Sequence, residues 1–438
     1  MLHPQRLRRR ATCRQPISVH SVAVALVRGV AGAFLLLAGV ACAVVPGAER
    51  VALVSAAATP AGSWDYLGDA LDDAAGQIEA LAASDLERRE GYRWLARSLF
   101  SGFDRFLEYA NPAIPEFYRA QSAHRKFAGD NPDQLYHVAA VASEFRYRVR
   151  GQWSAPGVRT ELIELSVYGG GLSFDDDTAK RRLVAYMDER NLEIAEDGSF
   201  EVVVGVDPAE GNWLRLEEDA EMLLIRRYFA SPQPADRLPL SIERIDGVPP
   251  REPLTQRELA KGLIASGAFL RETAKIWGRW YPDVLARHGP NRLDPLPDDG
   301  DLLTPAGLTY LQGAWSVADG EVLVVRFRPP DVPYWGFLPM NIWMESLDWR
   351  VAPVSRNGFD SQLDPDGMVT LVVSEVDPGH PNWIATLGHR RGLMSMRLAR
   401  LGEQPLPEVE TTLLPRDELA GFLASRGAPP LQSAATPR

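Results

Sequence analysis

Residues 377–383 (DPGHPNW) repeat the signature of residues 207–213 (DPAEGNW), and this pair of D-P-x-x-x-N-W stretches decides the fold. Each copy follows an Asp-Gly turn and an apolar run of strand character. Self-similarity at a fixed offset marks repeated supersecondary units. The sequence therefore predicts an internal duplication.

The repeat extends upstream of the signature. The apolar run at residues 200–206 (FEVVVGV) matches residues 369–376 (VTLVVSEV), and Tyr136 matches Tyr310. The distance from the Asp-Gly turn to the signature is one residue longer in the second copy. Because a β-bulge accommodates one extra residue in a paired strand, we expect a bulge in the second copy.

Most segments after residue 126 are short runs of β-branched and aromatic residues bounded by turn residues. Such strands favour antiparallel sandwich or jelly-roll packing, with helices segregated to the ends. The predicted fold class is α+β, with two tandem antiparallel β-sandwich or jelly-roll-like units, each preceded by a helical layer.

Capping boxes predict where two helices begin, because a Ser or Thr and a Glu three residues later satisfy free backbone N–H groups. Residues 84–87 (SDLE) start a helix that reaches about residue 109, and residues 255–258 (TQRE) start one that should end at Trp280, before Pro282. We also expect a crossover helix at 178–190 and a final helix at 415–425.

These features predict an order of segments along the chain. The segments are an export leader (1–59), an N-terminal helical layer (60–125), the first β-unit (126–250), a helix and linker (251–300), the second β-unit (301–412), and a C-terminal helix with a disordered tail (413–438).

The leader has the pattern of an export signal. Arginines between residues 6 and 14 precede the apolar run at 29–45, which ends in small residues. The sequence predicts a periplasmic or secreted protein. An uncleaved transmembrane anchor is the alternative, since the run is only slightly short of the roughly 20 residues that span a bilayer.

Composition excludes several classes of partner and chemistry. Both cysteines, Cys13 and Cys42, lie in the leader, so the exported part has no disulfide and no thiol nucleophile. The formal net charge is −11, which argues against nucleic acid as a partner. A membrane would be contacted only through an uncleaved leader.

Residues 334–349 (YWGFLPMNIWMESLDW) alternate as a strand does. One face would carry Trp335, Asn341, Trp343 and Glu345, a mixture of rings and polar groups typical of a pocket wall. The alternative is that a helix or the partner sheet covers this face. Ser346 and Asp348 follow in the same stretch.

The loop at 126–136 (KFAGDNPDQLY) concentrates oxygen-bearing side chains. Asp130, Asn131 and Asp133 could bind calcium or place a general base beside a substrate, with Tyr136 nearby. Asn-Pro-Asp is also an ordinary turn sequence. No other metal or cofactor is expected. The signature Asn and Trp residues are interpreted as structural, closing each β-unit.

Several of these motifs together resemble the bacterial family catalogued as domain of unknown function 1214. The resemblance rests on KFAGDNPDQLY, YWGF, WMESLDW, LDPDG and GHRRGLM and covers about residues 86–414. It implies a β-sandwich or jelly-roll core with added helices, and it implies no settled activity.

No nucleophile-elbow, Walker or dinucleotide fingerprint is present in the sequence. We therefore expect an exported protein that binds a small amphipathic or ring-bearing ligand between its β-units, through Asn131, Tyr136, Trp335, Asn341, Trp343 and Ser346. The alternatives are a hydrolase or lyase using a carboxylate pair, and a structural protein of the cell envelope. The candidates for that carboxylate pair are Asp130, Asp133, Glu345 and Asp348.

Overall fold

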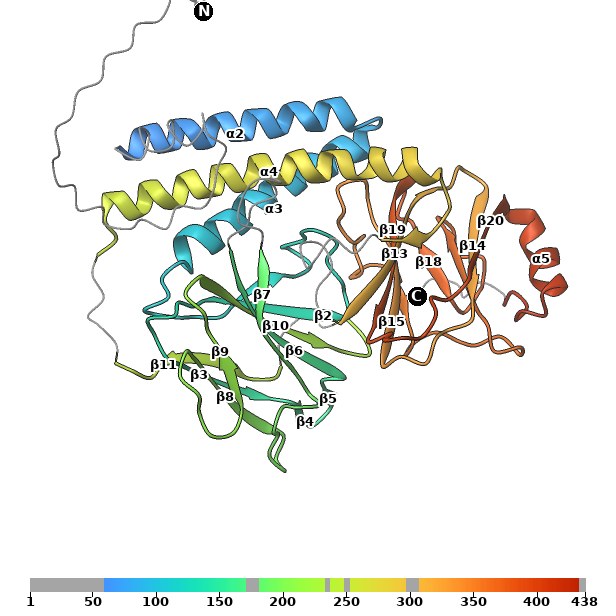
Figure 1. Ribbon diagram of the computed structural model, residues 1–438. Coiled ribbons are helices and arrows are strands. Elements are labelled where there is room, and N and C mark those ends of the chain that lie inside the picture. Colours follow the sequence, from blue (N-terminus) through green and yellow to red (C-terminus); the bar gives the residue numbers. More distant parts are fainter. Residues whose placement is uncertain (1–58, 171–180, 233–236, 248–252, 297–306, 433–438) are drawn as a thin grey trace, which may run out of the picture. The chain divides into compact units, whose positions relative to one another are not determined.

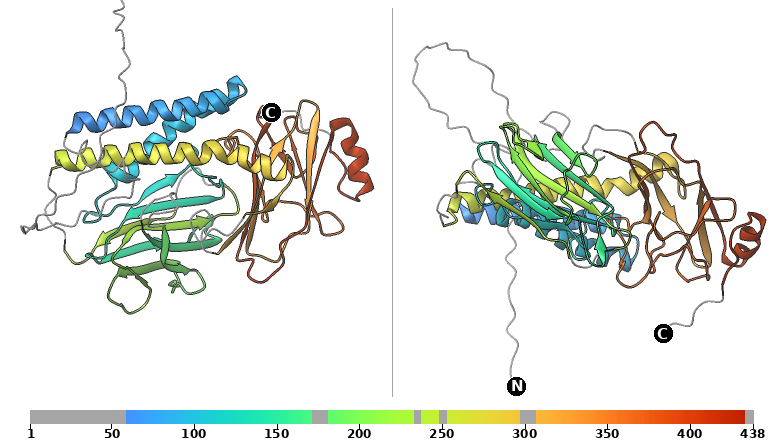
Figure 2. Two further views of the ribbon diagram at one scale, coloured as in Figure 1. Left: turned by 45° about the horizontal axis from the view of Figure 1, so that its top comes forward. Right: turned by 90° about the horizontal axis from the view of Figure 1, so that it is seen from below.

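The computed structural model describes residues 59–170, 181–232, 237–247, 253–296 and 307–432 (Figure 1). The predicted leader lies outside these residues except for Thr59. Long helices lie along one side of the molecule and two β-units occupy the other (Figures 1 and 2). Among the described helices, none combines the length and the hydrophobicity needed to cross a membrane.

The helical layer is built from three long helices. They are α2 (Pro60–Leu81), α3 (Asp85–Phe103), which continues as a π-helical turn η1 (Asp104–Glu108), and α4 (Gln256–His288). Thr255 and Glu258 form the complete capping box, and Ser84 accepts a hydrogen bond from the Glu87 N–H. Helices α2 and α4 run side by side (Figure 2) and bury leucine and alanine side chains between them.

The first β-unit is a sandwich of a five-stranded sheet, in the order β1-β2-β10-β6-β7, and a four-stranded sheet, in the order β11-β3-β8-β9. Its strands are β1 (Tyr118–Gln121), β2 (Gln134–Ala140), β3 (Tyr147–Gln152), β6 (Leu162–Gly169), β7 (Arg182–Asp188), β8 (Ser199–Gly205), β9 (Trp213–Arg215), β10 (Ala220–Tyr228) and β11 (Leu240–Arg244). The short pair β4 (Ser154–Ala155) and β5 (Val158–Arg159) lies outside both sheets.

The second β-unit has sheets in the orders β12-β13-β19-β15-β16 and β18-β17-β14-β20. Its strands are β12 (Asp294–Pro295), β13 (Leu308–Ser316), β14 (Glu321–Phe327), β15 (Tyr334–Pro339), β16 (Arg356–Asn357), β17 (Val369–Ser374), β18 (Trp383–Ala385), β19 (Arg391–Ala399) and β20 (Val409–Pro415). The chain then forms η2 (Arg416–Glu418) and α5 (Leu419–Ser425), close to the predicted final helix.

The two units have the same topology. When β2, β6, β10, β3 and β8 are matched with β13, β15, β19, β14 and β17, the strand orders coincide. Even the parallel pairing of β8 with β9 recurs in β17 with β18. The predicted duplication and the α+β class with two tandem β-units are confirmed.

The signature residues close each unit in the same way. The side chain of Asn212 bonds the backbone of Glu193 and Glu201, and that of Asn382 bonds the backbone of Gln362 and Thr370. The indole N–H of each following Trp donates to the carbonyl at the end of the neighbouring strand, β8 or β17. The structural interpretation of the signature is confirmed.

Three local expectations are wrong. Residues 182–188 form strand β7 rather than a helix, because this run (RLVAYMD) pairs with β6 along the sheet. Helix α4 continues through Pro282 to His288, since Tyr281 and Val284 remain buried beyond Trp280 and their packing holds the helix. Strand β17 has no bulge, because its ladders with β14 and β18 are regular and the extra residue falls in the turn after Ser374.

The predicted long strand 334–349 is also much shorter. Strand β15 ends at Pro339, and residues 341–345 form a tight turn closed by a bridge between Met340 and Ser346. Met344 has a φ of 56° in that turn. The carbonyl oxygen of the Asn341 side chain accepts hydrogen bonds from the N–H groups of Trp343 and Glu345. An Asn that bonds its own backbone favours a turn over an extended chain, and this overrides the alternating pattern.

Candidate functional site

A cavity of about 230 Å³ lies between the helical layer and the five-stranded sheets of both β-units. We call it the central cavity. Strands β2, β6 and β10 contribute from the first unit and β13 and β19 from the second, while α3, η1 and α4 provide the opposite wall. The volume is just below the roughly 300–1,000 Å³ typical of ligand pockets, so it suits a small molecule.

Equivalent tyrosine and arginine residues from the two copies line the central cavity. Tyr136 on β2 lies directly opposite Arg226 on β10, and Tyr310 on β13 lies directly opposite Arg397 on β19. Directly opposite residues of antiparallel strands project from the same face of the sheet. All four line the central cavity, so the duplication places the same two side-chain types there twice.

The helical wall of the cavity is aromatic. Helix α4 contributes Phe269, Trp277 and Trp280, and the loop before β2 contributes Phe127, whose ring lies 5.3 Å from that of Phe269. The indole N–H of Trp280 donates to Gln312 at 2.7 Å. These rings offer flat apolar surfaces for a ring or an alkyl chain.

The polar lining of the cavity is cationic. Arg105, Arg181, Arg226 and Arg397 line it, and no acidic side chain is among the described lining residues. Arg105 pairs with Glu221 at 3.1 Å, outside the lining. A cavity with this lining favours an anionic or hydrogen-bond-accepting guest.

Tyr168 and Arg181 meet at the cavity wall. The Arg181 guanidinium lies over the Tyr168 ring, 3.8 Å from its centroid. Burial raises the pKa of Tyr168, but the positive charges of Arg226 and Arg181 outweigh burial and bring that pKa below its usual value. Burial also lowers the pKa of Arg181 to about 10, so this guanidinium stays charged at neutral pH.

The two stretches predicted to bind a ligand, residues 126–136 and 334–349, do meet. Their contacts with each other form a buried junction. Asp130 accepts hydrogen bonds from the N–H and the hydroxyl of Ser346, at 2.9 and 2.6 Å. Asn131 donates to the hydroxyl of Tyr334, and that hydroxyl donates to Asp133. We call this set of contacts, with those of Lys126 and Glu345 below, the inter-unit junction.

Asp133 is enclosed in the inter-unit junction. Its carboxylate also accepts a hydrogen bond from Asn357 at 3.0 Å. Burial raises the pKa of Asp133 to about 6, although the hydrogen bonds from Asn357 and Tyr334 act to lower it. The oxygens of Asp130 and Asp133 that were considered as calcium ligands thus accept hydrogen bonds from protein groups. The described residues contain no group of three or more metal-binding side chains.

Glu345 is the second predicted carboxylate in the inter-unit junction. One guanidinium nitrogen of Arg97 on α3, Nη1, donates to both carboxylate oxygens of Glu345, at 2.9 and 2.8 Å, and Glu345 has no exposed surface. Burial raises the pKa of Glu345 to about 7, and the Arg97 charge opposes that rise. Lys126 donates to the carbonyls of Ser346 and Leu347, so the first copy's loop is tied to the second copy's turn.

The remaining predicted residues lie apart from the central cavity. Trp335 is in the core of the second sandwich, 5.0 Å from Phe327, and Trp343 stacks on Trp94 at 5.7 Å. Both rings are covered, which is the alternative that the sequence left open. Asp348 pairs with Arg350, whose hydrogen bond lowers the pKa of that carboxyl. Of the predicted ligand-binding residues, Tyr136 lines the central cavity.

The cavity arginines were not among the predicted site residues. Arg226 and Arg397 sit within mostly apolar segments, MLLIRRY at 222–228, which also holds Arg227, and LMSMRLA at 393–399. Each occupies the same place in its copy. An arginine retained in both copies of a buried strand is the signal that could have identified them, because a charge in such a strand requires a partner.

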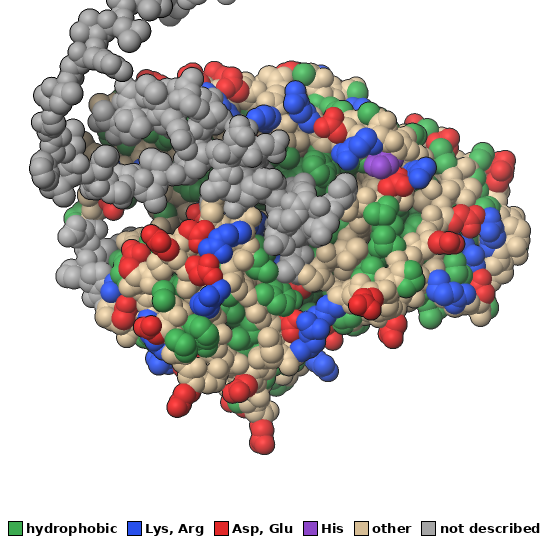
Figure 3. All heavy atoms as spheres, in the orientation of Figure 1, with side chains coloured by type: hydrophobic (Ala, Val, Ile, Leu, Met, Phe, Trp, Pro, Cys, Tyr) green, Lys and Arg blue, Asp and Glu red, His purple; other side chains and the backbone are tan. Residues whose placement is uncertain are grey.

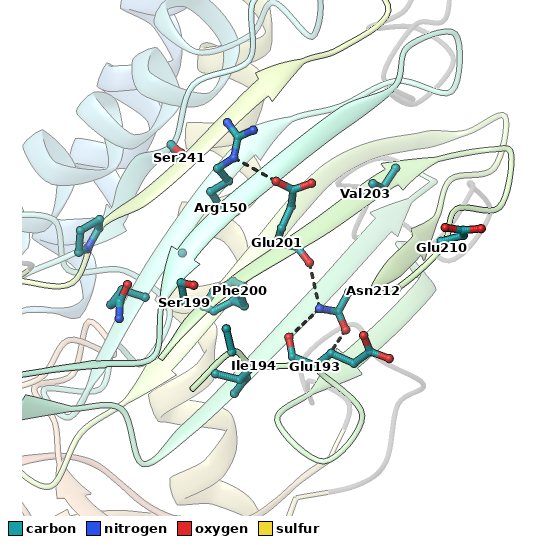
Figure 4. A pocket seen from close by; sticks show the side chains of 15 residues that line it. Arg150, Glu193, Ile194, Ser199, Phe200, Glu201, Val203, Glu210, Asn212 and Ser241 are labelled. Atoms are coloured by element: carbon teal, nitrogen blue, oxygen red, sulfur yellow. Dashed lines mark hydrogen bonds and ion pairs between the residues drawn. The ribbon is translucent and has the colours of Figure 1, made fainter. Parts of the chain in front are cut away.

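An open groove of about 810 Å³ lies on the outer face of the first four-stranded sheet (Figure 4). Its Arg150 pairs with Glu201 at 3.0 Å and with Glu243 at 2.7 Å. Asn212 uses its amide in the backbone bonds described above. The groove is therefore a solvent-exposed sheet face with paired charges, similar to the mixed charges elsewhere on the surface (Figure 3).

Comparisons with known proteins identify a family and two similar crystal structures. The profile of a family described as "Protein of unknown function (DUF1214)" matches residues 138–233. A crystal structure of an uncharacterized protein from Burkholderia cenocepacia is 30% identical, with a TM-score of 0.73, and the match covers 84% of this chain and 99% of that chain. A crystal structure of the VPA0106 protein from Vibrio parahaemolyticus is 12% identical, with a TM-score of 0.41 and coverage of 78% and 99%. No functionally curated protein matches the chain.

Proposed function

The chain belongs to the family described as Protein of unknown function (DUF1214), and for this member we propose that it binds a small amphipathic or ring-bearing molecule in the central cavity. The observation that carries the proposal is a cavity in which aromatic rings face buried polar side chains that have no partner among the described residues. A cavity needed only for packing would be filled by apolar side chains.

The polar groups without partners support binding. Among the described residues, the Nε atom of Arg397, the Nε2 atom of Gln134 and the indole nitrogen of Trp277 have no hydrogen-bond partner. Each of the three side chains is at least nine-tenths buried and lines the cavity. A buried donor without a partner costs about 1–3 kcal/mol, so a guest that accepts these hydrogen bonds is stabilised.

A thermal-shift screen tests the proposal. The purified protein is heated with a panel of small aromatic and aliphatic compounds, both neutral and charged, at millimolar concentration. A compound present at 100 times its Kd stabilises the folded state by about 2.7 kcal/mol, which raises the Tm by a few degrees.

A blocked variant shows where binding occurs. Ala120 lines the cavity on the edge strand β1 and is only partly buried, so Ala120→Phe fills space with little strain elsewhere. Its own Tm should stay near that of the wild type while the ligand-induced shift disappears. If no compound in the panel raises the Tm of the wild type, the binding proposal is wrong for molecules that fit this volume.

The hydrolase or lyase interpretation receives no comparable support. Asp130, Asp133 and Glu345 give their oxygens to hydrogen bonds within the inter-unit junction, and none of them lines the central cavity. An acid and base pair must reach a substrate to act on it. We therefore base the proposal on binding.

We also propose that the protein acts outside the cytoplasm. The support is the sequence of the leader, in which arginines precede the apolar run at residues 29–45. Cell fractionation together with N-terminal sequencing of the mature protein tests this. Recovery of the intact chain in the cytoplasmic fraction would contradict it.

A further inference from the structure

The two cavity arginines differ in how their charges are balanced. Arg226 lies opposite Glu164 on β6, and the two side chains pair at 3.4 Å. Arg397 lies opposite Gly336 on β15, which is the corresponding position in the second copy. The carboxylate that neutralises the first arginine therefore has no counterpart beside the second.

The other contacts of Arg397 do not replace that carboxylate. Its guanidinium donates to the carbonyl of Gly129, and among the described residues its Nε atom has no partner and the side chain forms no ion pair within 4.0 Å. Asp130 contributes to the electrostatic environment of Arg397, but its two oxygens accept hydrogen bonds from Ser346. Arg397 is only 5% exposed, so within the described part of the chain it is a buried cation with which no carboxylate pairs.

Arg181 adds a second positive group to the same wall. Among the described residues its Nε atom also lacks a partner, and its charge lies over the ring of Tyr168. Such a cation–π contact stabilises the charge far less than desolvation of an ion destabilises it. A guest with a negative charge would offset that cost for both arginines.

The wall formed by α4 determines which apolar part of a ligand would fit. Phe269, Trp277 and Trp280 of α4 present rings to the cavity, and the volume of about 230 Å³ leaves room for one ring or a short alkyl chain. A guanidinium matches the planar geometry of a carboxylate through two parallel hydrogen bonds. The two walls thus suit the two ends of one amphipathic acid.

We propose that the central cavity binds a small aromatic or aliphatic carboxylate, with Arg397 as the anchor of its charge and the rings of α4 as the site of its apolar end. This inference rests on the proposed binding function and specifies the class of ligand. Arg226, whose charge Glu164 already balances, does not determine the preference for anions.

Calorimetric titration with three matched probes tests the inference. The probes are 3-phenylpropanoate, 3-phenylpropan-1-ol and 3-phenylpropylamine, which share a ring and a chain and differ in charge. The carboxylate should bind at least tenfold more tightly than the alcohol, and the amine should bind least, because it would place a second cation beside Arg397. Equal affinity for the alcohol and the carboxylate would overturn the inference while leaving the binding function intact.

Two variants distinguish the role of Arg397 in binding the carboxylate from that of Arg226. Arg397→Met should weaken the carboxylate at least tenfold and leave the alcohol within about twofold. The matched control is the double variant Arg226→Met with Glu164→Gln, which removes the balanced pair together and should keep the preference for the carboxylate. An equal loss of that preference in both variants would show that Arg397 is not the anchor.

Stability of the free protein gives a second measurement. Removing a buried cation that has no counter-charge should leave the Tm of Arg397→Met unchanged or higher, whereas Arg226→Met alone should lower it by leaving Glu164 unpaired. A folded Arg397→Met variant that still prefers the carboxylate, or binding of none of the three probes by the wild type, would contradict the inference. The second result would contradict the binding function as well.

Discussion

The outer faces of the two four-stranded sheets differ although their topologies are the same. In the first unit this face carries Arg148, Arg150, Glu201 and Glu243, which pair with one another in solvent. In the second unit part of this face is apolar, and that part, which includes Val324 and Val372, is covered by α5 (Figure 1). Val324 occupies the position that Arg148 has in the first unit, as the ladders with β8 and β17 show.

This difference separates the residues that set the strand order from those that decide whether a sheet is covered. Strand order follows from features common to both copies, namely the inner apolar positions, the Asp-Gly turns and the signature. Whether a sheet is covered follows from the residues that alternate with the inner ones. A strand with one buried face alternates in polarity, as RYRVRG does, whereas VLVVRF is nearly continuous because both of its faces are buried.

The largest effect on stability is expected from exchanging residues at the position that Val324 has in the second unit and Arg148 has in the first. Val324→Arg places a charge under α5, where Val324 is 1% exposed and packs with Leu419 and Leu423. We expect the free energy of unfolding to fall by about 4 kcal/mol or more, because a buried charge without a partner is expensive. Urea unfolding followed by circular dichroism measures the loss.

Arg148→Val is the matched control in the first unit. It removes two partly exposed ion pairs, to Glu201 and Glu243, and should change the free energy of unfolding by less than about 1 kcal/mol. Similar losses in the two variants would mean that α5 does not bury the second sheet in solution.

The next effect concerns acid sensitivity, because the second signature contains His380 where the first has Glu210. Burial, with a smaller contribution from Arg356, lowers the pKa of His380 to about 4. Between pH 6.5 and pH 4 the unfolded chain binds a proton that the folded protein excludes, so stability falls as the pH falls through this window. The shift corresponds to a loss of up to about 3 kcal/mol.

His380→Gln tests this pH dependence, since the glutamine cannot take up a proton. The free energy of unfolding of the variant should decline less than that of the wild type between pH 7 and pH 4. Parallel declines for the two proteins would assign the acid sensitivity to other groups.

A smaller effect, equal in the two copies, is expected for the signature asparagines. Asn212→Ala and Asn382→Ala each remove three hydrogen bonds to the backbone. Each should cost about 1–3 kcal/mol, because buried backbone groups lose their partners. Equilibrium unfolding of the two variants under the same conditions compares them. A loss confined to one variant would show that the signature closes only one unit.

The smallest effect is expected on the exposed face of the first unit. Glu201→Thr introduces the residue type that the second copy has at Thr370 and removes ion pairs to Arg148 and Arg150. Exposed pairs contribute about 0.2–1 kcal/mol and are screened by salt. The difference from the wild type should therefore be near 0.5 kcal/mol in dilute buffer and vanish in 1 M NaCl, as thermal unfolding would show.

Much of the fold could be predicted because it depends on local patterns. The duplication followed from the signature, and two helix starts followed from capping residues whose contacts lie within one turn. The strand at 182–188 and the continuation of α4 beyond Pro282 could not be predicted in this way. In both places pairing or packing with distant residues overrides the local preference.

The site was only partly predictable for a similar reason. The loop with Asp130 and the turn with Ser346 were identified as special, and the structure brings them together. Their oxygen atoms suggested a ligand site, because a sequence alone does not show that the polar groups of the two stretches form hydrogen bonds with each other. Conversely, Arg397 became notable only when the structure placed Gly336, instead of a carboxylate, beside it.

The inter-unit junction has a consequence for how the duplicated chain can be divided. Arg97 and Lys126 precede or begin the first copy, yet their partners, Glu345 and the carbonyls of Ser346 and Leu347, belong to the second. A break in the connection near residue 250 would therefore leave each fragment with polar groups that only the other fragment completes. The two halves descend from one pattern, but neither is a self-sufficient domain, and separately produced fragments should become native only when they are mixed.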